Sequence, residues 1–176
     1  DPTFTYSTLG LETGDSLTGS MDRAAGSDVG TYALGLGDLA NTNYTITLSD
    51  TPVDFTINAL AVTVTPDGGQ AKTYGDSDPT FTYTMTPSLV GTDSFTGLMD
   101  RAAGSDVGTY ALGLGDLANT NYTITLDATP VDFTINTKAV TVIPDANQAK
   151  TYGDADPTFT YSTLGLETGD SFTGLM

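Results

Sequence analysis

One stretch of the chain occurs twice. Residues 21–48 and 99–126 are identical at every position, and the offset between the two copies is 99 − 21 = 78 residues. This period exceeds the roughly 20 to 50 residues of solenoid and propeller repeats and lies in the range of a small autonomous domain. The duplication therefore predicts a tandem array of globular units.

The array is not a whole number of periods. The segment at residues 1–6 returns at 78–83 and at 156–161. We interpret the chain as a fragment of a longer repeat protein. The alternative is that a strand of one chain completes the next, as in donor-strand complementation.

Three parts follow from this alignment. We expect residues 1–58 to be a repeat that lacks its first strands and residues 59–136 to be a complete repeat. Residues 137–176 are then the start of a further repeat, truncated. A unit of about 78 residues buries roughly 60% of its unfolded surface, which is enough for one modest core.

The charge of the chain limits its partners. Twenty-two acidic residues against five basic ones give a net charge of −17. Such a field repels nucleic acid and anionic membrane surfaces, and no run of 18 apolar residues occurs. We therefore expect no nucleic-acid partner and no direct membrane insertion.

Apolar residues of the complete repeat alternate with a period of two, which is typical of half-buried strands. Residues 100–104 are compatible with a single helical turn, and residues 87–93 form a loop whose length differs between copies, so we expect it to face solvent. The pattern predicts an all-β fold of antiparallel sandwich units, because each sheet must bury its apolar face. The strands are expected at 61–64, 72–74, 80–84, 94–99, 110–114, 122–126 and 131–135.

A local motif makes the sandwich more specific. Residues 106–110, Asp-Val-Gly-Thr-Tyr, recur at 28–32 and match the tyrosine corner of immunoglobulin-like domains, whose phenol donates a hydrogen bond to the upstream backbone. The Cys pair and core Trp of antibody domains are absent. The alternative is that Tyr110 is simply a core aromatic residue at the start of a strand.

Several segments recur in a fixed order: residues 72–79, Gly97, residues 107–110, 121–124 and 132–135. This ordered set resembles the MBG repeats of the Tyr-Gly-x type, which occur in tandem in very large bacterial surface and secreted adhesin-like proteins. The resemblance spans essentially the whole chain. It implies an extracellular, all-β stalk or fibre module without catalytic residues, and a β-grasp-like unit is the alternative fold.

Two pairs of aspartates are candidate metal ligands. Asp76 and Asp78, repeated as Asp154 and Asp156, have the D-x-D spacing that can offer two carboxylates to Ca²⁺. A complete EF-hand loop is absent. The functional interpretation is calcium at a junction between units, and the alternative is a solvated Asx turn before proline.

The few cations also have regular positions. Lys72 lies four residues before Asp76, and Lys150 repeats this spacing, whereas Arg23 and Arg101 directly follow an aspartate. We expect surface ion pairs worth less than about 1 kcal/mol each.

Catalysis is not expected. The chain has no His or Cys, so a nucleophile would need a Ser–Lys or paired-carboxylate arrangement. We predict a structural spacer of an extracellular bacterial adhesin or surface fibre, whose partners are the neighbouring repeats of the same polypeptide. Two alternatives remain: homo-assembly into filaments by strand complementation, and binding of a host or matrix glycan or protein through residues 87–93.

Overall fold

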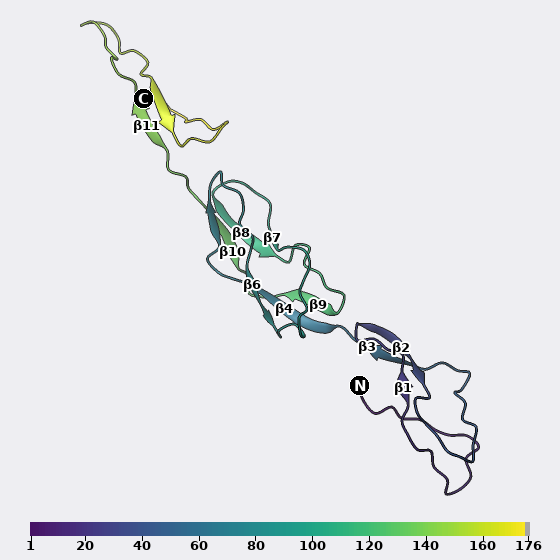
Figure 1. The fold of residues 1–176 in the computed structure, drawn as a ribbon. Coiled ribbons are helices and arrows are strands. Elements are labelled where there is room, and N and C mark those ends of the chain that lie inside the picture. The colour runs from purple at the N-terminus through teal and green to yellow at the C-terminus, as the bar shows by residue number, and fades with distance from the viewer. Residues whose placement is uncertain (175–176) are drawn as a thin grey trace. The chain divides into compact units, whose positions relative to one another are not determined.

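The computed structural model describes residues 1–174, and within this range the chain is all-β and contains no helix (Figure 1). Residues 1–62, 87–95 and 118–124 form one compact unit. Residues 63–86, 96–117 and those from 125 onward form a second. The predicted class of β-sandwich repeats is confirmed. The predicted boundaries of the three parts remain a prediction. The two compact units are built from interleaved segments, so their limits do not test boundaries that were drawn from the sequence period.

The first unit contains a three-stranded antiparallel sheet. Its strand order is β1-β2-β3, and Tyr32 of β2 lies opposite Phe55 of β3. Thr18 and Ala40, which lie outside the named strands, form an isolated antiparallel β-bridge. The bounds are β1 Asp22–Arg23, β2 Gly30–Gly35 and β3 Asp54–Ile57.

The second unit contains a four-stranded sheet of mixed direction in the order β5-β10-β8-β7. Phe133 of β10 lies opposite Tyr110 of β8 in an antiparallel pair. On its other side β10 runs parallel to β5, with Ile135 opposite Lys72. The bounds are β5 Ala71–Thr73, β7 Asp100–Arg101, β8 Gly108–Gly113 and β10 Asp132–Asn136.

Two further sheets complete the described fold. One has the order β6-β4-β9, in which Val64 of β4 lies opposite Met85 of β6. The other is the antiparallel pair of β11 and β12, in which Val142 lies opposite Thr163. The bounds are β4 Leu60–Pro66, β6 Tyr83–Thr86, β9 Tyr122–Leu126, β11 Thr141–Pro144 and β12 Tyr161–Leu164.

Among the described residues, the buried apolar side chains all lie between residues 62 and 135. In the second unit the rings of Phe81 and Phe133 meet edge to face, with centroids 5.2 Å apart. Those of these residues that have identical counterparts in the first copy are only half-buried there. The buried set is Val62, Val64, Phe81, Met99, Leu112, Tyr122, Phe133 and Ile135.

Two local predictions were wrong. Residues 94–99 form no strand, because the amide of Leu98 donates to the Asp116 carboxylate at 2.6 Å and not to a neighbouring backbone. Residues 100–104 form no helical turn: Asp100 and Arg101 make the short strand β7 and pair with β8.

Candidate functional site

An ion-pair cluster lies in the second unit beside β7. Arg101 donates from Nε to Asp78 Oδ2 at 2.8 Å and from Nη2 to Asp78 Oδ1 at 3.2 Å. Its Nη1 donates to the carbonyls of Ala102 at 2.9 Å and Gly104 at 2.7 Å. The side chain is 11% exposed, so the guanidinium charge is held inside the fold and its donors are directed at protein atoms.

Lys72 supplies a second cation to the same carboxylate. Its Nζ lies 2.7 Å from Asp78 Oδ1. The hydrogen bonds from Arg101, and after them those from Lys72, lower the pKa of Asp78 below its ordinary value of 3.8. Asp78 is therefore an ionised anchor for two cations.

The cluster is joined to the tyrosine corner. The guanidinium carbon of Arg101 lies 4.8 Å from the ring centroid of Tyr110. The Tyr110 hydroxyl donates to the Asp106 carbonyl at 2.7 Å, which confirms the predicted corner. Gly104 has a φ of +149°, and a Cβ there would lie 2.2 Å from the Tyr110 ring. Only glycine fits under the tyrosine.

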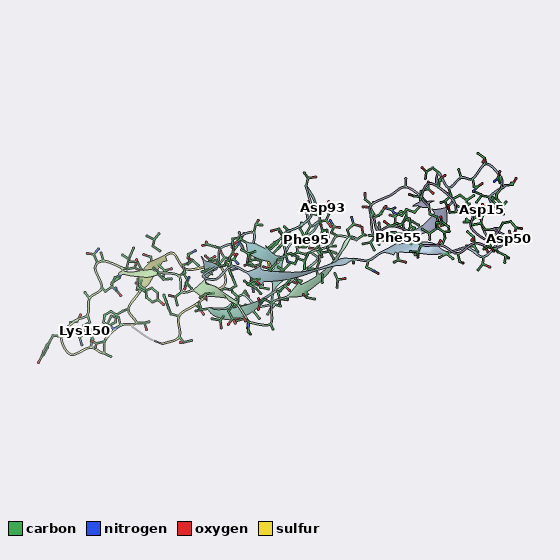
Figure 2. All side chains as sticks on the ribbon, turned by 90° about the horizontal axis from the view of Figure 1, so that it is seen from below. Asp15, Asp50, Phe55, Asp93, Phe95 and Lys150 are labelled. Carbon is green, nitrogen blue, oxygen red and sulfur yellow. The ribbon has the colours of Figure 1, made fainter. Side chains whose placement is uncertain are left out.

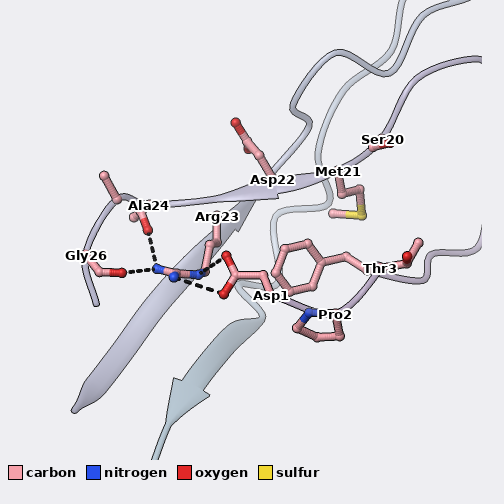
Figure 3. A pocket seen from close by; sticks show the side chains of 11 residues that line it. Asp1, Pro2, Thr3, Ser20, Met21, Asp22, Arg23, Ala24 and Gly26 are labelled. Atoms are coloured by element: carbon pink, nitrogen blue, oxygen red, sulfur yellow. Dashed lines mark hydrogen bonds and ion pairs between the residues drawn. The ribbon is translucent and has the colours of Figure 1, made fainter. Parts of the chain in front are cut away.

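The first unit repeats this arrangement (Figure 3). Arg23 donates to Asp1 at 2.9 and 3.0 Å and to the carbonyls of Ala24 and Gly26 at 3.0 and 2.7 Å. Its guanidinium carbon lies 4.7 Å from the Tyr32 ring centroid. The Tyr32 hydroxyl donates to the Asp28 carbonyl at 2.7 Å. The two copies build the same contacts from the same residue types.

A second tyrosine fixes the loop of variable length. Tyr122 is buried; its hydroxyl accepts from the Val90 amide at 2.8 Å and donates to Asp93 Oδ2 at 2.7 Å. Burial raises the pKa of this phenol, and the hydrogen bond to Asp93 adds to the increase. The edge of the Tyr122 ring also meets Phe95, which Figure 2 labels together with Asp93.

The first copy holds its loop in the same way. Tyr44 accepts from the Glu12 amide at 3.1 Å and donates to Asp15 Oδ2 at 2.5 Å. Both copies thus fix the loop at two residues that are three positions apart. The additional residue of the longer loop lies before Val90.

The predicted calcium ligands differ in their partners in the structure. Asp78 is bound by Arg101 and Lys72, and Asp156 Oδ1 lies 2.5 Å from Lys150 Nζ. Asp76 and Asp154 are exposed, and the backbone amide of each closes a turn by donating to the carbonyl three residues earlier. Within residues 1–174 no three acidic side chains gather into a metal-binding group. The calcium site at these aspartates stays a prediction.

The structure identifies the partners of the predicted ion pairs. Lys72 pairs with Asp78 and not with Asp76, and Arg101 pairs across 23 residues with Asp78 and not with the adjacent Asp100. Sequence reasoning missed this pair. A usable signal was present, because the Asp-Pro dipeptide and the arginine keep nearly the same separation in both copies.

The pattern of identical contacts in two copies agrees with the comparison of the chain with protein families. The family model of the MBG domain, YGX type, matches residues 1–53, 62–134 and 140–176. The chain belongs to the MBG domain family. No curated protein and no solved structure matches the chain.

The three segments that match the MBG model contain different ion pairs. The first contains Arg23 with Asp1, and the second contains Arg101 with Asp78 and Lys72. The third contains the pair of Lys150 and Asp156. The MBG family indicates a repeat domain of surface proteins.

Each of the two arginine clusters of this MBG chain borders an open depression. The volumes are about 450 Å³ beside Arg23 and about 480 Å³ beside Arg101. The arginine in each directs its hydrogen bonds inward, so neither depression presents an unpaired guanidinium to a ligand. Among the residues that the structure describes, no helix is long and apolar enough to cross a membrane.

Proposed function

We propose that this chain is a structural spacer of an extracellular bacterial adhesin or surface fibre and that it has no catalytic role. The proposal rests on the observation that the polar side chains repeated in both copies form hydrogen bonds within the fold. Arg101, Tyr110 and Tyr122 make internal contacts, and their first-copy equivalents make the same contacts. The duplicated residues thus maintain a scaffold, which is what a repeated spacer requires.

The chemistry of the side chains supports this role. The sequence has no His or Cys to act as a nucleophile or base near neutral pH. Asp78, which binds two cations, is held ionised by Arg101 and Lys72. An ionised, ion-paired carboxylate is a poor general acid.

The net charge also suits a spacer. A charge of −17 keeps the chain soluble and makes neighbouring identical units repel one another. Identical neighbours otherwise favour domain swapping and misassembly. Strong negative charge therefore favours arrays whose units remain separate.

The spacer role can be tested on arrays that extend the chain by one, two and four further copies of residues 59–136. Small-angle X-ray scattering should give a maximum dimension that increases by a constant amount for each copy. A dimension that stops increasing while the mass rises would contradict the proposal. A glycan array probed with the same proteins covers the adhesive alternative, and saturable binding lost on replacement of residues 87–93 would favour that function.

Self-assembly by strand exchange is a second candidate. Residues 44–48 are identical to β9, which lies beside β4, yet they form no strand in the described structure. Near the other end of the chain β11, which corresponds to β4, is paired within the described residues with β12 alone. One chain thus holds an unpaired strand sequence and an edge of the kind that accepts it.

Light scattering over a range of protein concentrations tests this second candidate. Strand exchange predicts a mass that grows with concentration. The change Thr45→Pro removes a ladder donor and should abolish the growth. A monomer at every concentration would contradict it.

A further inference from the structure

Asn121 contacts the tyrosine corner of the first copy. Its side-chain Oδ1 accepts from the Val29 amide at 2.9 Å, and its Nδ2 donates to Asp28 Oδ1 at 2.9 Å. These residues are separated by more than 90 positions but belong to the same compact unit. The amide side chain therefore uses its acceptor and its donor on two consecutive residues of one turn.

The backbone around Asn121 fixes the direction of this side chain. The Asn121 amide donates to Asn119 Oδ1 at 2.9 Å, and the Asn121 carbonyl accepts from the Leu60 amide at 3.0 Å. Asn121 is thus held both by its own turn and by the start of β4. A side chain fixed in this way loses little conformational entropy when it forms its two hydrogen bonds.

The turn that it binds is also preformed. The Asp28 carbonyl already accepts from the Tyr32 hydroxyl inside the corner. The Val29 amide and the Asp28 carboxylate bind Asn121 instead. A neutral amide matches this pair, because it accepts from the amide and donates to the carboxylate, whereas an aspartate would meet the carboxylate with like charge.

The chain contains an internal control for this contact. Asn43 has the same sequence surroundings as Asn121, and the turn at Asp106 and Val107 is identical to that at Asp28 and Val29. Within the described residues neither the Asn43 side chain nor the Val107 amide makes a hydrogen bond. Val107 is 51% exposed and Val29 is 37% exposed. Local sequence therefore does not cause the contact.

We propose that the outer face of the tyrosine corner, formed by the Asp28 carboxylate and the Val29 amide, is a docking surface for the asparagine side chain of the following repeat. The partner of this surface is another repeat of the same kind, carrying an asparagine at the position of Asn121. The proposal rests on the spacer function, because it concerns how successive repeats join. By the same chemistry Asp106 and Val107 offer this surface to a next repeat.

Hydrogen exchange of the full 176-residue chain, resolved at single amides by NMR, tests the proposal. The Val29 amide should exchange about tenfold more slowly than the Val107 amide, which has identical neighbours. The change Asn121→Ala should bring Val29 to the rate of Val107, and the matched change Asn43→Ala should leave both rates unaltered. Equal rates in the unmodified chain, or a Val29 rate that Asn121→Ala does not alter, would overturn the proposal.

Two additions separate docking from folding. The Leu34 amide, which donates to the Val53 carbonyl at 3.0 Å, reports whether the first unit, which contains Asn121 and Val29, stays folded in each variant. If Asn121→Ala also exposes Leu34, Asp28→Ala tests the same contact from the other side, with Asp106→Ala as its control. Asp28→Ala should then raise the Val29 rate, and an unchanged rate would overturn the docking surface. That outcome would leave the spacer function standing, because the scattering of longer arrays tests it independently.

Discussion

The guanidinium of Arg101 lies over the ring of Tyr110 at 4.8 Å, and that of Arg23 lies over Tyr32 at 4.7 Å. The agreement holds although the first copy is less buried and its sequence has no counterpart of Lys72. The arginine, its distant aspartate and the corner tyrosine therefore form one unit of structure. This unit joins β7, the start of β8 and the Asp-Pro segment.

The arginine should not be replaceable by lysine. In Arg101→Lys the single ammonium cannot reproduce both contacts with Asp78 and both contacts with the carbonyls of Ala102 and Gly104. We expect a loss of about 2 kcal/mol in the free energy of unfolding, measured by urea titration followed by tyrosine fluorescence. Lys150→Arg, which alters a largely exposed ion pair, should have little effect. Equal stability of Arg101→Lys and the unmodified chain would show that the paired hydrogen bonds of the Arg101 guanidinium do not stabilise the fold.

Acid should weaken the second unit through Asp78. Its pKa is lowered in the folded state, so its ionised form adds stability above the ordinary value of 3.8, and this stability is lost as the pH falls below that value. Asp78→Asn should lower stability at neutral pH and flatten the dependence on pH below 3.8. Asp76→Asn is the matched control, since Asp76 has no cation within ion-pair distance in the described part of the chain. Parallel pH profiles for Asp78→Asn and the unmodified chain would contradict the pairing.

Gly104 should be irreplaceable in the corner. Gly104→Ala places a Cβ 2.2 Å from the Tyr110 ring at a φ of +149°. We expect destabilisation of at least about 2 kcal/mol, with a thermal midpoint lowered in calorimetry. Gly68→Ala is the control, because its Cβ would meet nothing within 4 Å. Similar midpoints for the two variants would show that the corner is not as tightly packed as described.

Much of the fold follows from the alternation of apolar residues. The strand expected at 122–126 is β9. Both ends of the strand expected at 131–135 lie one residue from those of β10, and the strand expected at 61–64 lies inside β4. The tyrosine corner was also predictable, because the phenol binds a carbonyl four residues earlier, which is a local relationship. Features that depend on nearby residues are therefore available from the sequence.

Features that depend on tertiary contacts were not available. The parallel pairing of β5 with β10 joins residues 63 positions apart, as in Ile135 and Lys72, and no local period indicates it. The short strand β7 exists only because β8 lies beside it, so its two residues look like a turn. Asp78 resembles a metal ligand in sequence because the arginine that binds it lies 23 residues away.

The spacer role is tested most directly by electron microscopy of arrays in which residues 59–136 are repeated two, four and eight times between two terminal labels. The account predicts that the distance between the labels increases in proportion to the number of repeats, with the same increment for each. A distance that levels off as repeats are added, or particles in which arrays have merged into larger filaments, would contradict it.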